Sequence, residues 1–111
     1  MRFYEHESKT LLARRGIAVP AGRVARSVAE AAAAAVVVGL PVALKAQVLS
    51  GGRMKAGAVG FAETGEDARS AAEAVLSLEV GGRKAEGLLV EAKVDAAREY
   101  YVGVTYDALA K

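Results

Sequence analysis

A lysine in a predicted strand and the basic residues of the loop after it are best suited to chemistry. Lys45 lies in the run 42–48, where polar and apolar residues alternate as in a half-buried strand. The glycine-rich stretch 50–57 follows and carries Arg53 and Lys55. Glycines let backbone amides approach phosphate oxygens closely, and the basic side chains add cationic donors. The loop therefore predicts phosphate binding.

This loop matches neither of two common phosphate-binding signatures. It lacks the Gly-Lys-Ser/Thr ending of a Walker loop, and no glycine triplet opens a helix as in a dinucleotide-binding fingerprint. A flexible hairpin with solvated charges is therefore the alternative interpretation of the same residues.

Two glutamates could line a cleft from another part of the chain. Glu91 ends the predicted extended segment 87–92, and Glu99 begins the next one, 99–106. If both face one cleft, their carboxylates could accept hydrogen bonds from an adenine amino group or a ribose hydroxyl. Backbone groups of 92–94 would then face the base edge. Taken singly, each glutamate is more commonly a solvated carboxylate at a strand end.

Helical and extended patterns alternate along the chain. Their spacing predicts helices over 3–15, from Ser27 to Gly39 and from Thr64 to Leu78, the last two opening at hydroxyl N-caps. The predicted strands are 22–25, 42–48, 58–62, 87–92 and 99–106. This order predicts one α/β domain with α+β layers, whose last strand lacks a partner.

Composition limits the classes of function. The 111 residues contain no cysteine and one histidine, His6, so a disulfide framework or a zinc site is not expected. No apolar run could span a bilayer and the start is charged, so we expect a cytoplasmic protein without membrane contact. The net charge of +2 is spread along the chain, which argues against nucleic acid as a partner.

Three stretches, in one register, resemble the succinyl-CoA synthetase (succinate–CoA ligase) β subunit. The matching residues are Glu5, Lys9, 11–14 and 16–20; then 44–48, 51–53 and 55–57; and finally 89–92, Asp95 and 98–101. The resemblance implies an incomplete ATP-grasp fold, mainly its N-terminal lobe, with one edge strand unpaired. Within it, 1–20 would be the opening helix and crossover, 21–94 the small lobe, and 95–111 the start of the second lobe.

The resemblance also implies which residues bind nucleotide phosphates. Lys45 matches a family lysine that contacts the phosphates, and Gly52, Arg53 and Met54 match the loop that covers them. Met54 stands where the family usually has glycine. A side chain there is expected to hinder the close approach of the loop to phosphate.

At the other end of the nucleotide, Glu91 and Glu99 match carboxylates beside the adenosine, and Val94 matches a hinge position whose backbone faces the base. The implied cofactor is ATP or GTP with magnesium, whose ligands would lie beyond Lys111. The family joins a carboxylic acid to coenzyme A through a phosphohistidine on a separate α subunit, which is the implied partner. We therefore expect a nucleotide-binding segment that is inactive alone.

Two other functions are compatible with the sequence. The chain could be a truncated, non-catalytic relative that acts as a binding or assembly module, forming a homo-oligomer through the exposed edge of 99–106. A small RNA-binding domain that clamps phosphates with Arg53 and Lys55 is less well supported, because positive charge is not concentrated on one element.

Overall fold

The computed structural model describes residues 2–107 and 109, and its centre is an antiparallel sheet. The four strands lie in the order β1-β6-β2-β3, so that the last strand along the chain lies between β1 and β2. The strands are β1 (Gly22–Ala25), β2 (Val42–Ala46), β3 (Val59–Ala62) and β6 (Leu88–Ala92). Because alternate side chains point to opposite faces, each strand contributes to two different environments.

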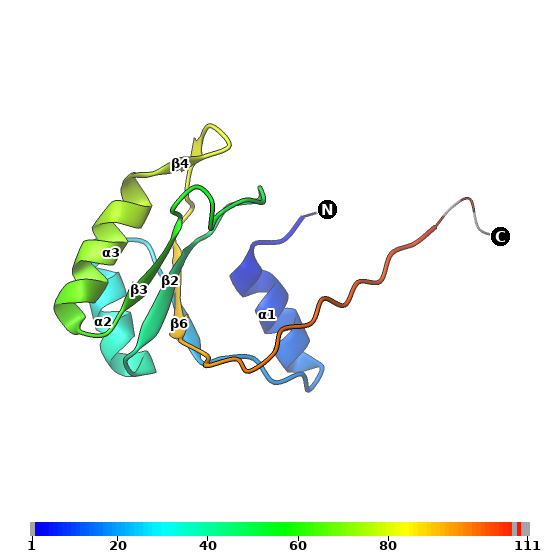
Figure 1. Cartoon of the computed structure of the whole chain (residues 1–111), viewed down its shortest axis with the longest axis horizontal. Helices are drawn as coiled ribbons and strands as arrows, with labels where there is room; N and C mark the ends of the chain where they lie inside the picture. Colours follow the sequence, from blue (N-terminus) through cyan, green and yellow to red (C-terminus); the bar gives the residue numbers. More distant parts are fainter. Residues whose placement is uncertain (1, 108, 110–111) are drawn as a thin grey trace.

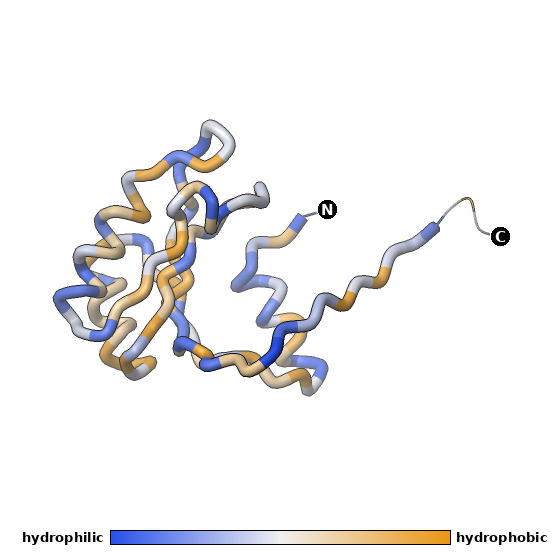
Figure 2. Tube along the Cα trace, in the orientation of Figure 1, coloured by the Kyte–Doolittle hydropathy of each residue, from blue (hydrophilic) through white to orange (hydrophobic). Residues whose placement is uncertain are grey.

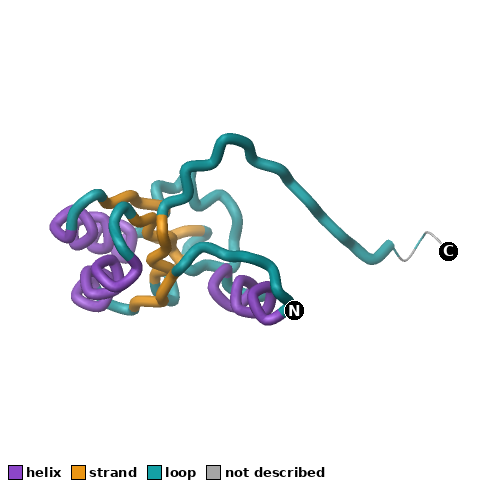
Figure 3. Tube along the Cα trace, turned by 90° about the horizontal axis from the view of Figure 1, so that it is seen from below, coloured by secondary structure: helices purple, strands orange, loops and turns teal. Residues whose placement is uncertain are grey.

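Three helices are distributed unequally over this sheet. Helices α2 (Val28–Val38) and α3 (Gly65–Ser77) cover one face, and α1 (Glu5–Arg14) lies on the other side (Figure 1). Figure 3, turned by 90°, shows the same separation of α1 from the other two helices. Strands β4 (Glu79–Val80) and β5 (Arg83–Lys84) form a separate hairpin. The predicted layered α+β fold is therefore confirmed.

The face under α2 and α3 contains the hydrophobic core. Leu44, Leu88 and Val90 of the sheet are fully buried there. They pack with alanines of both helices, whose small side chains let helix and sheet approach closely. Since burial stabilises by about 25 cal/mol per Å² of apolar surface, this face carries most of the hydrophobic stabilisation.

Both predicted helix starts on this face are confirmed by their caps. Ser27 Oγ accepts a hydrogen bond from the Glu30 amide at 3.1 Å, and the Glu30 carboxylate accepts one from the Arg26 amide at 2.7 Å. Thr64 Oγ1 accepts a hydrogen bond from the Asp67 amide at 3.1 Å. These side chains satisfy amides that the first helical turn leaves without a partner.

Elsewhere the predicted boundaries need small corrections. The helix expected over 3–15 spans the ten residues of α1. The strand expected over 42–48 ends at Ala46, and Gln47, which follows it, is buried. The short hairpin of β4 and β5 was not predicted as strands, because two residues are too few to show an alternation.

The strand predicted over 99–106 is not formed, since residues 93–107 contain no strand or helix. Its apolar side chains Tyr100, Val102 and Val104 are 79–97% exposed. Figure 2 shows hydrophobic residues recurring along this segment as it leaves the body of the molecule. A strand needs a neighbour for its backbone groups, and the described residues supply none.

The three expected parts of the chain are represented unequally. The four-stranded sheet, α2 and α3 all lie within the range 21–94 expected for the small lobe. The division at 20 and 94 stays a prediction, and residues 1, 108, 110 and 111 lie outside the described residues. In the described part, no helix is long and apolar enough to cross a membrane.

Candidate functional site

Strands β2 and β6 direct a lysine and a glutamate to the face that α1 covers. The strand register pairs Lys45 with Leu89, two residues before Glu91. Lys45 and Glu91 are therefore diagonal neighbours on one face, and Lys45 Nζ lies 2.5 Å from Glu91 Oε1. Leu44, which precedes Lys45 in β2, points to the opposite face of the sheet and is buried in the core.

Helix α1 places two more charges over this pair. Glu5 and Lys9 are one helical turn apart and form an ion pair at 3.0 Å. Lys9 Nζ donates to both oxygens of Glu91, at 2.8 and 2.6 Å. Glu5 accepts from Lys45 Nζ at 3.1 Å and from Arg53 Nη1 at 2.6 Å. We call these five side chains the charge network (Glu5, Lys9, Lys45, Arg53 and Glu91).

The charge network contains three cations and two carboxylates, so it retains an excess of positive charge. Its side chains are only 4–26% exposed, which weakens screening by solvent and salt. Such a cluster favours the approach of an anion. Glu91, which is 3% exposed, is not the solvated carboxylate of the alternative interpretation.

The network shifts the protonation of two of its members. Burial alone would raise the pKa of Glu5, but hydrogen bonds from Arg53 and Lys9 lower it from 4.5 to about 2. Burial alone would lower the pKa of Lys45, but its hydrogen bond to Glu91 and the charge of Glu5 raise it above 10.5. Both side chains are therefore charged at neutral pH.

A histidine and a glutamine extend the contact between α1 and the sheet. The backbone amide of His6 donates to Gln47 Oε1 at 3.0 Å, and His6 Nδ1 lies 2.8 Å from the same oxygen. Gln47 Nε2 donates to the Lys45 carbonyl at 3.1 Å, which fixes the orientation of the amide. His6 Nδ1 must then carry a proton, because Gln47 Oε1 only accepts. His6 thus anchors α1.

A cavity of about 970 Å³ opens beside the charge network. It lies next to strands β2, β3 and β6, the loop after β2 and the segment after β6. All the residues expected in a nucleotide site line it, namely Lys45, Gly52, Arg53, Met54, Glu91, Val94 and Glu99. The structure therefore brings together residues that are up to 54 positions apart in the sequence, from Lys45 to Glu99.

The loop after β2 is anchored by Arg53. The guanidinium donates through Nη1 to the Ala46 carbonyl at 3.1 Å as well as to Glu5, and the Arg53 carbonyl accepts from the Ala58 amide at 2.8 Å. Gly52 has a φ of 82°, a conformation that glycine adopts without strain. Met54 is 69% exposed at the cavity wall, and its φ is not in the left-handed region.

The cavity wall also contains an aromatic ring and apolar side chains. Val94 and Glu99 are both exposed, as is Phe61 of β3. Lys93 Nζ lies 5.2 Å from the centroid of the Phe61 ring, a cation–π contact. Pro20 also lines this cavity. The aromatic ring and the flanking apolar side chains form a surface suited to a planar base.

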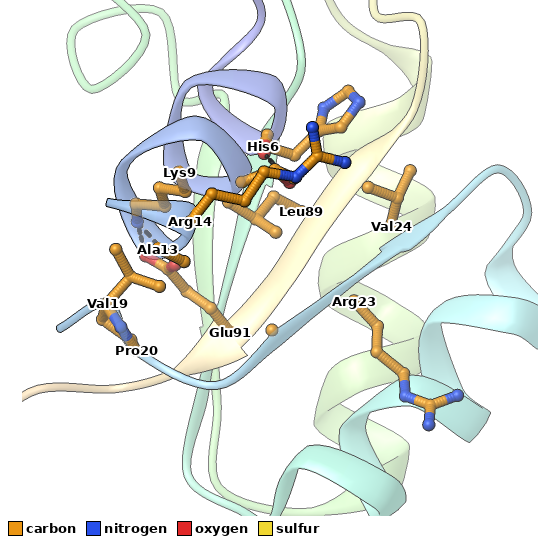
Figure 4. A pocket seen from close by; sticks show the side chains of 12 residues that line it. His6, Lys9, Ala13, Arg14, Val19, Pro20, Arg23, Val24, Leu89 and Glu91 are labelled. Carbon is orange, nitrogen blue, oxygen red and sulfur yellow. Dashed lines mark hydrogen bonds and ion pairs between the residues drawn. The ribbon is translucent and has the colours of Figure 1, made fainter. Parts of the chain in front are cut away.

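A second cavity, of about 490 Å³, lies between α1 and the edge strand β1 (Figure 4). Lys9 and Glu91 line both cavities, so their ion pair belongs to the wall between them. Figure 4 shows Arg14 reaching from α1 toward His6, whereas Arg23 points away from α1. In the described residues, no group of three or more His, Cys, Asp or Glu side chains could hold a metal ion.

Sequence reasoning did not assign Glu5, Lys9 or Phe61 to the site. The i, i+4 spacing of Glu5 and Lys9 was a usable signal, because it places opposite charges on one helix face. Nothing local in the sequence indicates that this face meets Lys45, since the contact spans 40 residues.

The chain matches one family model and many curated proteins. The model described as "ATP-grasp domain" matches residues 2–111. The chain is 46% identical, over 96% of its length, to succinate–CoA ligase (ADP-forming) subunit beta of Haloarcula marismortui. It is 41% identical, over its whole length, to succinate–CoA ligase (GDP-forming) subunit beta of Thermus thermophilus. It spans 28% and 29% of these two proteins.

Solved structures show the same fold. The dinucleotide-forming acetyl-coenzyme A synthetase 1 of Ca. Korarchaeum cryptofilum, in complex with coenzyme A and Ca-AMPCP, superposes with a TM-score of 0.76 at 27% identity. The match covers 85% of this chain and 43% of that one. These findings confirm the expected resemblance to the ATP-grasp part of the β subunit and the incomplete ATP-grasp fold.

Proposed function

The chain belongs to the ATP-grasp domain family, and from this premise we propose that it is the nucleotide-binding segment of an acyl-CoA ligase of the succinate–CoA ligase β-subunit type. The observation that carries the proposal is the large cavity, which residues from the glycine-rich loop, β2, β6 and the segment after β6 line together. Relatives named as ADP-forming and GDP-forming ligases support nucleotide use.

For the phosphates, we propose Lys45 and the loop Gly52–Met54 as the binding groups. The Lys45 ammonium and the Arg53 guanidinium supply cationic donors beside the cavity. The open space around Gly52, where an added Cβ would meet nothing, lets the backbone approach an anion. Bound nucleotide with magnesium would supply the phosphoryl group for the ligase reaction.

For the adenosine or guanosine, we propose the part of the same cavity that Phe61, Val94 and Glu99 line. Val94 would present backbone groups to the base edge, and Phe61 would contact the base face. Glu99 would accept a hydrogen bond from the ribose. Glu91 would act mainly by holding Lys45, because its two oxygens are already bonded to Lys9 and Lys45.

Catalysis and partners are proposed for the longer ligase rather than for this segment. We expect no turnover by the 111-residue chain with succinate, coenzyme A and Mg-ATP, because one wall of a cleft does not exclude water from a phosphoryl transfer. The ligase α subunit is the proposed partner, in line with the β-subunit names of the relatives.

Calorimetric titration with Mg-ATP and Mg-GTP tests the proposal. The wild-type chain should bind at least one nucleotide saturably, and Lys45→Ala should weaken binding by about tenfold or more, since it removes a charge-assisted phosphate contact. Lys84→Ala, an exposed lysine on β5, is the matched control and should bind like the wild type. No binding by the wild type, or equal loss in both variants, would contradict the proposed site.

A second candidate, the assembly module, is favoured by the exposed apolar side chains of 100–106. Such a segment can add to a sheet edge of a second copy. Sedimentation velocity at increasing concentration separates the two functions, because an assembly module should form a defined oligomer that substitution Val102→Asp with Val104→Asp abolishes. A monomer at every concentration excludes it.

A further inference from the structure

One member of the charge network has a different position from the other four. Lys9, Lys45, Arg53 and Glu91 all line the large cavity, whereas in the described structure Glu5 does not. Its carboxylate nevertheless contacts both proposed phosphate-binding cations, Lys45 and Arg53. Glu5 therefore touches these cations without facing the space that a ligand would occupy.

The contacts of Glu5 leave donors of both cations available. A lysine ammonium has three donors, and Lys45 uses two of them on Glu5 and Glu91. A guanidinium has five donors, and the hydrogen bonds of Arg53 within the described residues, to Glu5 and Ala46, both run through Nη1. A ligand could accept the remaining donors without displacing Glu5.

We infer that Glu5 is a positioning residue, which holds Lys45 and Arg53 from behind so that their remaining donors meet an anionic ligand in the large cavity. The inference rests on the proposed function, because it assigns the ligand's phosphates to the same two cations. Long basic side chains lose much rotamer freedom on binding, and a partner that orders them beforehand reduces that cost.

The charge of Glu5 also opposes an anion, and two contacts decide which effect is larger. Glu5 Oε1 lies 3.0 Å from Lys9 Nζ, so that part of its charge is already compensated. Each of its oxygens in addition holds one of the two phosphate-binding cations. We therefore expect the loss of ordering to exceed the gain in positive potential.

Titration of the 111-residue chain with Mg-ATP tests the role of Glu5 in binding. Glu5→Gln, which keeps the shape and removes the charge, should weaken affinity by about tenfold. Glu7→Gln is the matched control on the same helix: Glu7 is exposed and accepts a hydrogen bond from the Tyr4 amide, so the change should alter affinity by less than about twofold. Unchanged or tighter binding by Glu5→Gln would overturn the inference.

A double-variant comparison separates positioning from a general loss of structure. If Glu5 acts through Arg53, then Glu5→Gln should weaken binding clearly less in an Arg53→Ala background than in the wild type, because residues in direct contact are not additive. Full additivity would contradict action through Arg53. Methyl spectra of Leu44 and Val90 show at the same time whether each variant keeps the core.

Nuclear magnetic resonance of the Arg53 side chain decides the inference without nucleotide. The Nε–H group should be ordered in the wild type and in Glu7→Gln, and mobile on the nanosecond timescale in Glu5→Gln. Equal order in Glu5→Gln would overturn the positioning role. If the wild type bound no nucleotide, the proposed function would fail, while this measurement would still show whether Glu5 orders Arg53.

Discussion

The two faces of the central sheet are held by different forces. Toward α2 and α3, strand side chains such as Leu44 and Val90 are fully buried among alanines. Toward α1, whose ten residues are all described, no helix residue is buried, and the contacts are ion pairs and the bonds of His6 to Gln47. Removing charges from water is costly even when they are paired, which agrees with network side chains that stay 4–26% exposed. The first face determines the fold, and the second carries the cavity in which we propose that a ligand binds.

The largest effect on stability should come from removing a buried side chain on the apolar face. Leu44→Ala removes a fully buried side chain, so we expect a loss of about 2–5 kcal/mol in the free energy of unfolding. Urea denaturation at low and high salt measures it. The loss should be the same at both salt concentrations, and a strong salt dependence would contradict the assignment of this face to hydrophobic packing.

On the polar face, removing the most buried charge should lower the free energy of unfolding by a smaller amount. Glu91→Gln keeps the shape but leaves Lys9 and Lys45 without their shared carboxylate, so we expect a loss of about 1–3 kcal/mol. Glu99→Gln, at an exposed position of the same cavity, serves as control and should change stability by less than about 0.5 kcal/mol. An equal effect in both variants would show that Glu91 is not structural.

Acid should loosen the polar face before the apolar one. The pKa of Glu5 falls from 4.5 to about 2 on folding, so its contribution is fully present above pH 4.5 and is lost as the pH falls toward 2. The pH dependence of unfolding in Glu5→Gln should therefore be flatter than in the wild type over this window. Identical profiles would mean that Glu5 keeps an ordinary pKa.

Salt should have the smallest effect, confined to α1. The low exposure of the network side chains limits screening, so 1 M NaCl should weaken their attraction by only about 1 kcal/mol or less. Amide hydrogen exchange should accelerate in α1 and stay constant in β6, which is paired with β1 on one edge and with β2 on the other. Equal acceleration in both elements would remove the distinction between the faces.

Local patterns predicted the apolar half of the molecule well. Hydroxyl caps at Ser27 and Thr64 and the alternation around Leu44 depend on residues within a few positions of one another. The prediction of a strand over 99–106 was wrong. A strand forms only beside a neighbouring strand that pairs with its backbone, and an alternating sequence does not show whether that neighbour is present.

The candidate site was predicted as a set of residues, but its contacts were not. The resemblance selected Lys45, Glu91 and the loop around Arg53, and the structure gathers them at one cavity. The role of Glu5 could not be predicted, because its partners lie 40 and 48 residues away and depend on how α1 docks. Long-range ion pairs leave no periodic signal in a sequence.

Chemical-shift mapping of the chain during titration with Mg-ATP tests the central claim most directly, since it locates a ligand on one face or the other. We predict that the largest shifts fall on Lys45, the loop 51–55 and Val94, with the backbone of α2 and α3 nearly unchanged. Shifts concentrated on α2 and α3, or none at saturating nucleotide, would contradict it.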